Sequence, residues 1–477
     1  MQSVAKKKRK NPFTPGYGVY PPEMAGRDRL QDDLRDRLDG IVEKKCNPTA
    51  IVLTGPRGCG KTALLGWLRT KAKKRGLAIV SLASDTTTSP ATMAREMARQ
   101  FPQKLWERLS GLQVNVGPTG VGGGIDLASP RPEVKDEDLR TWIEALGCGE
   151  TGGVILIDEA HSMAPDVGTI FYNAAQAAAQ AKPILLVIAG TPDLRSVLRR
   201  SKATFTERGQ LQRIGRLTRN ESRRALTKPF KEQGINLPPD ILNPVLDEAQ
   251  DYPYFLQLWG KALWDVMQRY PDLPASSDVV AKARDESHQG RNDLYGERMQ
   301  ELAENDLLVP LAEMAWRVGP DRQPTRYDFE LAVRHLSRDS LEQGGMDQSR
   351  SEQKLLHTGF IWEHKIGNWE FGIPSLASYI RKDAVRHLLA SLQGDGNVHA
   401  LKKLADCFGP PTNQPMVISI DKLKIVLDQN HHIANAKLKQ FRSMKVLVAD
   451  AVPDHVRLMA PNLVQAIVAE ASKQKLL

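Results

Sequence analysis

The feature that most constrains this chain is a glycine-rich motif between a buried-type apolar run, Ala50–Thr54, and a helical pattern over Thr62–Arg75. Its eight residues follow the form GxxxxGK[ST]: Gly55, Pro56, Arg57, Gly58, Cys59, Gly60, Lys61 and Thr62. Glycines allow a tight turn there, so that backbone N–H groups converge on phosphate oxygens at a helix N-terminus. Lys61 would reach the β- and γ-phosphates and Thr62 would bind Mg²⁺, so the motif predicts an ATP and magnesium site.

A second apolar strand pattern, Gly153–Ile157, ends in two acids, Asp158 and Glu159. One carboxylate at such a position holds magnesium, usually through water, and another orients and polarises the attacking water. We assign the first role to Asp158 and the second to Glu159. An apolar strand that ends in acids is weak evidence alone, but after a P-loop it indicates ATP hydrolysis.

Strands and helices alternate around these motifs. Strand patterns cover 50–54, 78–83, 153–157 and 184–189, and helical patterns cover 62–75, 91–109 and 166–181. Such alternation predicts an α/β fold with a parallel sheet covered on both faces. A glycine-rich stretch at 111–132 departs from it and is expected to be an inserted loop or hairpin. From 218 to about 300 helical patterns continue without strands, which indicates a helical lid.

The fourth strand pattern ends in Ala189-Gly190-Thr191-Pro192. At the carboxyl edge of the sheet, the Thr191 hydroxyl could sense the γ-phosphate or the attacking water. Alternatively, Thr191 only begins a turn before Pro192. The residues alone leave both interpretations open.

Two more features complete a resemblance. Arg27 lies in a Gly-Arg-Asp lead-in, and residues 251–257 read Asp-Tyr-Pro-Tyr-Phe-Leu-Gln. Together with the P-loop, the paired acids and Thr191, they resemble the AAA+ superfamily. The similarity points to the branch shared by origin-recognition-type initiators and STAND signalling ATPases, and it covers roughly residues 11–270. It departs at Asp251, where the signature of that branch usually has glycine.

The resemblance implies further site residues. Arg27 and Pro253 would lie near the bound nucleotide. An arginine from a neighbouring subunit often completes such a site, so a homo-oligomer is expected. Arg208 is the candidate for that arginine, followed closely by Arg213 and Arg216, and a surface ion pair is an equally good interpretation.

A helicase interpretation also presents itself. Asp158-Glu159-Ala160-His161 spells the DEAH box, and residues 212–219 mimic the helicase arginine motif. In those helicases a second complete domain of roughly a hundred residues or more separates the two motifs. Only about fifty residues intervene here, enough for one helix and one strand. We therefore reject the helicase interpretation and expect His161 merely to begin a loop.

The C-terminal part contains one pattern twice. The first copy is Trp369, Phe371, Pro374, Leu376 and Ile380, and 87 residues later the second copy is Val456, Leu458, Pro461, Leu463 and Ile467. Apolar triplets at 360–362 and 447–449 precede the two copies at equal distance. The pattern indicates a winged helix and a second, similar unit, although junctions between a strand, a proline and a helix commonly look this way. Basic residues in the last unit's candidate recognition helix, 435–445, do not all share one face, so a solvated helix is as good an interpretation as a phosphate-binding one.

We therefore expect five segments along the chain. They are an extended basic, proline-rich arm (1–25), a P-loop ATPase core (26–217), a helical lid (218–300), a winged helix (301–390) and a second basic unit (396–477). The net charge of +10 supports this division, because Lys6–Lys10 supply half of it, and residues 396–477 carry eleven Lys/Arg against six Asp/Glu. The basic run is either a solvated arm or a contact for nucleic acid, lipid or an import receptor.

Other parts of the composition narrow the setting. Four scattered cysteines form no CxxC pair and are typical of reduced thiols, not of a zinc site. Apolar runs fall far short of the roughly 20 residues that a membrane helix needs, so no membrane partner and a cytoplasmic location are expected. Two functional hypotheses remain. One is a DNA-associated ATPase that contacts duplex DNA through winged helices, and the other is a signalling or defence switch that acts on protein partners.

Overall fold

The computed structural model describes most of the chain, and all structural statements concern the described residues. These are 10–16, 20–100, 138–147, 152–201, 209–270, 277–305, 307–319, 322, 324–332, 348–365, 368–392, 396–411, 416–444, 446–449, 454–458 and 460–477. The chain divides into two compact units, Met1–His288 and Gln289–Leu477, which are taken separately below. The glycine-rich stretch 111–132 and the candidate Arg208 lie outside the described residues.

The first unit contains a five-stranded parallel sheet with the strand order β2-β3-β4-β1-β5. Its strands are β1 (Ile51–Thr54), β2 (Ala78–Leu82), β3 (Gly153–Ile157), β4 (Ile184–Gly190) and β5 (Gln210–Arg213). Every residue of β1, β3 and β4 is buried, which explains their unbroken apolar sequences. The α/β parallel fold predicted from the sequence is confirmed.

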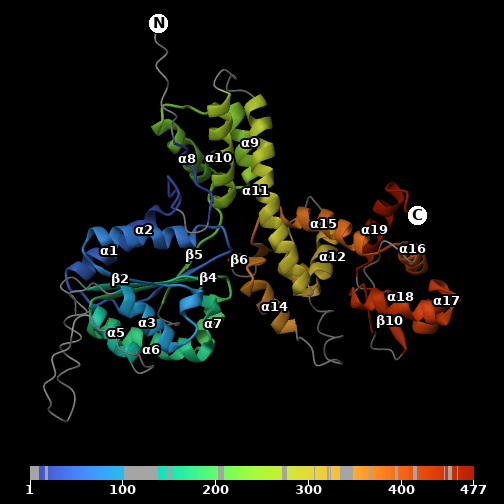
Figure 1. Ribbon diagram of the computed structural model, residues 1–477, viewed down its shortest axis with the longest axis horizontal. Coiled ribbons are helices and arrows are strands. Elements are labelled where there is room, and N and C mark those ends of the chain that lie inside the picture. Colours follow the sequence, from blue (N-terminus) through green and yellow to red (C-terminus); the bar gives the residue numbers. More distant parts are fainter. Residues whose placement is uncertain are drawn as a thin grey trace, which may run out of the picture. The chain divides into compact units, whose positions relative to one another are not determined.

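Helices cover both faces of this sheet (Figure 1), α1 and α2 on one face and α3, α5, α6 and α7 on the other. Their bounds are α1 (Asp28–Val42), α2 (Lys61–Lys74), α3 (Pro90–Gln100), α5 (Asp138–Gly147), α6 (Pro165–Ala181) and α7 (Leu194–Arg200), with short 3-10 turns η1 (Ser84–Thr86) and η2 (Ala160–Ser162). Side chains of α3, α5 and α6 join those of β2 and β3 in one apolar core. Because helices cover the two faces of the sheet, loops occupy its carboxyl edge.

The sequence patterns did not reveal β5. Its residues, Gln-Leu-Gln-Arg, are half-buried to exposed, and the strand pairs only with β1 at the edge of the sheet. An edge strand with one solvated side needs no apolar run, so it leaves little hydrophobic signal.

Beyond the sheet, the first unit continues as helices. These are α8 (Arg219–Glu232), α9 (Pro239–Ala249), α10 (Pro253–Arg269) and α11 (Ser277–Glu304), of which α11 runs past His288 into the second unit. Thr218 and Glu221 form a capping box that starts α8, with each side chain satisfying a backbone N–H of the other. The predicted run of helices after residue 218 is confirmed.

The described part of the N-terminal arm packs on α8 and α10. Phe13 is 1% exposed, and its ring centroid lies 5.2 Å from that of Phe230. A Cβ on Gly260 would lie 2.3 Å from the Phe13 ring, so this helix position must be glycine for the ring to fit. The Asn11 side chain also donates a 2.9 Å hydrogen bond to the Asp265 carboxylate.

The second unit holds two hairpins that are each followed by a helix. Its elements are α12 (Leu308–Val318), α14 (Gln348–His357), β6 (Ile361–Lys365), β7 (Asn368–Phe371), α15 (Leu376–Ser391), α16 (Asn397–Phe408), β8 (Met416–Ser419), α17 (Ile420–Leu427), α18 (His431–Ser443), β9 (Leu447–Ala449), β10 (His455–Leu458) and α19 (Pro461–Lys473). The repeated sequence pattern corresponds to β7 with α15 and to β10 with α19. Both copies turn their apolar positions into the core, which explains the repeat.

The last stretch has the element order helix, strand, helix, helix, hairpin, with a three-stranded antiparallel sheet ordered β8-β10-β9. This arrangement is consistent with the expected winged helix. The boundaries proposed for the five segments stay predictions. No described helix has the length and apolar character that a bilayer-spanning helix requires.

Candidate nucleotide site

The P-loop turns tightly because glycine stands where other residues cannot. Gly58 has φ +78° and Gly60 has φ +91°, in the left-handed region that side chains disfavour. Gly55 is needed for another reason, since a Cβ there would lie 1.9 Å from the carbonyl oxygen of Ile214. The Gly55 N–H also donates to the Gly190 carbonyl at 3.3 Å, which ties the loop to β4.

Lys61 is buried at the start of α2 and is 5% exposed. Its Nζ donates to the carbonyl oxygens of Gly55 and Pro56, at 2.8 and 2.9 Å. Burial lowers the pKa of Lys61, while the charges of Cys59, Glu159 and Asp158 raise it. The ammonium is thus held inside the loop, where incoming phosphate oxygens would replace the carbonyls as its partners.

Asp158 and Glu159 follow β3 at the same edge of the sheet. The Asp158 carboxylate accepts the Glu159 N–H at 2.9 Å, and Glu159 has φ +50°. A non-glycine residue in this left-handed conformation costs free energy and is often found at functional sites. The turn presents two consecutive carboxylates that both act on the charge of Lys61.

Thr191 lies between the P-loop and the acids because β4 lies between β1 and β3. The register pairs Thr54 with Gly190 and Ile157 with Ile188. Thr191 is fully buried, and its hydroxyl has no hydrogen-bond partner among the described residues. Its carbonyl accepts the Leu194 N–H at 3.0 Å, so it also begins a turn. The sensing role of its hydroxyl stays a prediction.

His161 lies in the turn η2 after β3, and it does more than begin a loop. Its side chain is 3% exposed and lies between Glu159 and the backbone of Thr191. The sequence gives no signal for this, since the contact with Thr191 joins residues 30 apart.

Residues after the sheet reach back to the loop. Tyr252 is buried, and its hydroxyl donates to the Arg57 carbonyl oxygen. This contact places the start of α10, where Pro253 is the first residue, beside the P-loop. Arg27 donates from its guanidinium to the Gly215 carbonyl at 2.6 Å, and burial lowers its pKa. The roles of Arg27 and Pro253 near the nucleotide stay predictions, and sequence reasoning missed Tyr252.

The candidate arginines for a neighbouring site are only partly described. Arg208 lies outside the described residues, whereas Arg213 ends β5 and is exposed, as is Arg216. An arginine finger must be exposed to reach another subunit, and Arg213 and Arg216 meet that condition. Their role as arginine fingers stays a prediction.

The donor atoms fit magnesium. No group of three or more His, Cys, Asp or Glu side chains among the described residues could hold a metal. Mg²⁺ in nucleotide sites is bound by one or two protein oxygens together with phosphates and water. Thr62 on α2 and Asp158 after β3 would supply that donor set, and bound Mg²⁺ would neutralise phosphate charge. Among the described residues, Cys46, Cys59 and Cys407 form no disulfide.

The comparisons with known proteins agree with this geometry. A family model described as an AAA domain matches residues 45–198, from just before β1 into α7. Residues 45–198 are thus similar to AAA domains. The predicted resemblance to the AAA+ superfamily is thereby confirmed for the part of the chain that carries the P-loop, Glu159 and Thr191.

Solved structures are similar to a larger part of the chain. The Walker-type ATPase PABY2304 of Pyrococcus abyssi aligns with a TM-score of 0.51 at 13% identity, covering 76% of this chain and 99% of that one. ORC1 of Aeropyrum pernix in complex with DNA aligns with a TM-score of 0.39 at 13% identity, covering 97% of each chain. The likeness concerns the fold alone and rests on the first structure. A search of curated proteins gives no match.

Proposed function

We propose that the AAA domain binds ATP with Mg²⁺ and hydrolyses it, and that the nucleotide state switches the protein's conformation and assembly. The observation that carries the proposal is the strand order. With β4 between β1 and β3, the P-loop, Thr191 and Asp158-Glu159 end adjacent strands at one edge of the sheet. Open α/β sheets bind their ligands at this edge.

Each group of residues has a separate role in the proposed reaction. The P-loop N–H groups and Lys61 bind phosphate oxygens, and Thr62 and Asp158 hold Mg²⁺. Glu159 orients a water molecule and accepts its proton. The water oxygen then bonds to the γ-phosphorus as the bond to the bridging oxygen breaks, which releases ADP and phosphate. Catalysis of this kind rests on positioning and on charge stabilisation.

The helices after β5 provide a route from nucleotide to conformation. Tyr252 at the start of α10 contacts the backbone of Arg57 inside the P-loop. Arg27 holds the segment after β5 through the Gly215 carbonyl. A phosphate that rearranges the P-loop would therefore act on the Tyr252 contact, and in a homo-oligomer a neighbouring subunit's arginine, with Arg208 as the first candidate, would respond.

The variant Lys61→Ala tests nucleotide binding. We expect ATP affinity to fall by at least ~100-fold, since charge-assisted hydrogen bonds to phosphate are each worth ~1.5–3 kcal/mol and the ammonium makes more than one. Isothermal titration of the full chain measures this, with circular dichroism to check folding. Wild-type affinity in the folded variant would contradict the P-loop assignment.

We further propose that the C-terminal unit associates with duplex DNA. Support comes from the consistency of the last stretch with a winged helix and from its excess of basic residues. In α18, Lys437 pairs with Asp428 at 3.4 Å and is only 12% exposed, so it is engaged within the fold. Lys439 and Arg442 on the same helix form no ion pair with a described acidic side chain and are the better candidates for phosphate contacts.

A salt titration decides between DNA and a protein partner. If winged helices bind duplex DNA, the affinity of the full chain falls steeply with salt, by about one unit of log-log slope for each phosphate contact. Replacing Lys439 should then reduce that slope by about one. No binding to duplex DNA at low salt would favour the alternative, a switch that acts through protein partners and uses hydrolysis only to reset.

A further inference from the structure

We infer that His161 is a positioning residue for the hydrolytic carboxylate, linking Glu159 to Thr191 so that both face the γ-phosphate as one unit. The inference rests on the proposed hydrolysis and adds a residue to its machinery. His161 is two residues from Glu159 in the chain, whereas the fold brings it to Thr191, 30 residues away.

Two contacts define the arrangement. The His161 Nε2 lies 3.3 Å from the Glu159 Oε2, and the Thr191 N–H donates to the His161 Nδ1 at 3.4 Å. The imidazole thus lies between the turn after β3 and the end of β4. Because β4 also pairs with β1, the link extends to the strand that carries the P-loop.

The contacts fix the tautomer of the ring. A nitrogen that accepts from a backbone N–H carries no hydrogen, so the Thr191 contact leaves Nδ1 without one. The ring hydrogen of neutral His161 is therefore on Nε2, the atom that faces the Glu159 carboxylate. A donor aimed at one carboxylate oxygen restrains its rotation and leaves the other oxygen for water.

Burial makes this restraint effective. The His161 side chain is 3% exposed, whereas that of Glu159 is 23% exposed and so remains open to the site. The ring also lies against the backbone of Gly190, where an added Cβ would come within 3.3 Å of Nδ1. A side chain held on both sides has few alternative rotamers, so it can fix the carboxylate that it contacts.

Two polar variants separate the contacts. His161→Gln keeps an N–H donor near the Nε2 position and can reach Glu159. His161→Asn places its amide near the Nδ1 position and can reach only Thr191. We expect kcat for ATP hydrolysis to fall ~10–100-fold in His161→Asn, the range seen when the partner of a functional ligand is removed. His161→Gln should keep most of the activity, and ATP affinity should change little in both.

A double-mutant cycle with Glu159→Gln separates positioning from general stability. If His161 acts through Glu159, His161→Asn has no further effect on kcat in the Glu159→Gln background. The inference is overturned by wild-type kcat in His161→Asn, or by an equal loss in both backgrounds. Wild-type kcat in Glu159→Gln alone would instead overturn the proposed role of Glu159. ATP affinity is measured for His161→Gln and His161→Asn in the same assay. A folding defect common to both variants would lower this affinity, and that outcome would count against the inference.

Discussion

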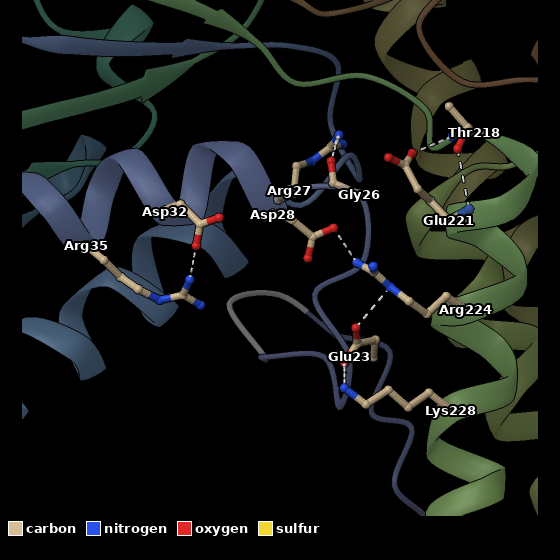
Figure 2. Close-up of polar contacts among 10 residues, drawn as sticks. All are labelled: Glu23, Gly26, Arg27, Asp28, Asp32, Arg35, Thr218, Glu221, Arg224 and Lys228. Carbon is tan, nitrogen blue, oxygen red and sulfur yellow. Dashed lines mark hydrogen bonds and ion pairs between the residues drawn. The ribbon is translucent and has the colours of Figure 1, made fainter.

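The nucleotide edge of the sheet and the junction between α8 and the start of α1 are built in opposite ways. At the edge, Lys61, Thr191 and His161 are buried, and Gly55 has no room for a side chain. At the junction, the charged contacts are ion pairs between partly exposed side chains (Figure 2). The buried arrangement at the nucleotide edge fixes the positions of side chains. The exposed ion pairs at the junction can be broken at a low cost in free energy.

The ion pairs of the junction centre on two basic residues of α8. Arg224 lies 2.6 Å from Asp28 and 3.2 Å from Glu23, and Lys228 lies 2.7 Å from the other oxygen of Glu23. Arg224 is 40% exposed and Lys228 is 49% exposed. Exposed pairs of this kind contribute ~0–1 kcal/mol each. The contacts of Tyr252 and Arg27, and the close packing of Gly26 against Glu221 and Leu217, also tie the helices after β5 to the core.

Of the two regions compared, the nucleotide edge should show the larger effect. Gly55→Ala should lower ATP affinity by more than ~10-fold and the free energy of unfolding by ~1–3 kcal/mol, because its Cβ would overlap the Ile214 carbonyl and force the backbone to move. Titration with ATP and urea denaturation measure both. Gly66→Ala in α2 is the matched control, since nothing lies within 4 Å of its added Cβ. That variant should gain up to ~1 kcal/mol of stability.

A smaller effect is expected at the junction. Arg224→Ala should change the free energy of unfolding by less than ~1 kcal/mol, and this difference should shrink at high salt because exposed charges are screened. ATP affinity should shift by less than ~5-fold, the equivalent of that energy. Arg99→Ala, which removes an exposed pair inside α3, is the control and should leave ATP affinity unchanged. A loss as large as that of Gly55→Ala would show that the junction is as rigid as the site.

The contrast between constrained and exposed regions also explains which features could be predicted from the sequence. Phosphate binding requires fixed residue types at fixed spacing, so Gly55, Lys61 and Thr62 were recognisable without a structure. Buried strands carry unbroken apolar runs, which made β1, β3 and β4 predictable, whereas the edge strand β5 carries none. The division of the chain at His288 falls inside α11 and has no compositional signal.

Contacts between distant segments escaped sequence reasoning for a physical reason. No spacing rule links His161 to Thr191 or Tyr252 to Arg57, since these pairs meet only after the sheet and the helices have packed. From the sequence alone, His161 is expected only to begin a loop. Its DEAH context suggests a helicase, and the short spacing between the two helicase-like motifs excludes that interpretation. The repeat at 369–380 and 456–467 was recognisable because both copies bury the same positions, apart from Pro461, which is half-buried.

The central claim is that Glu159 activates water in an ATP site built on the carboxyl ends of β1, β3 and β4. Single-turnover hydrolysis by Glu159→Gln, measured alongside ATP affinity, tests it most directly. We predict wild-type affinity with turnover slowed by ~10²–10⁴-fold, the usual contribution of a positioned base. Wild-type turnover in this variant would contradict the account.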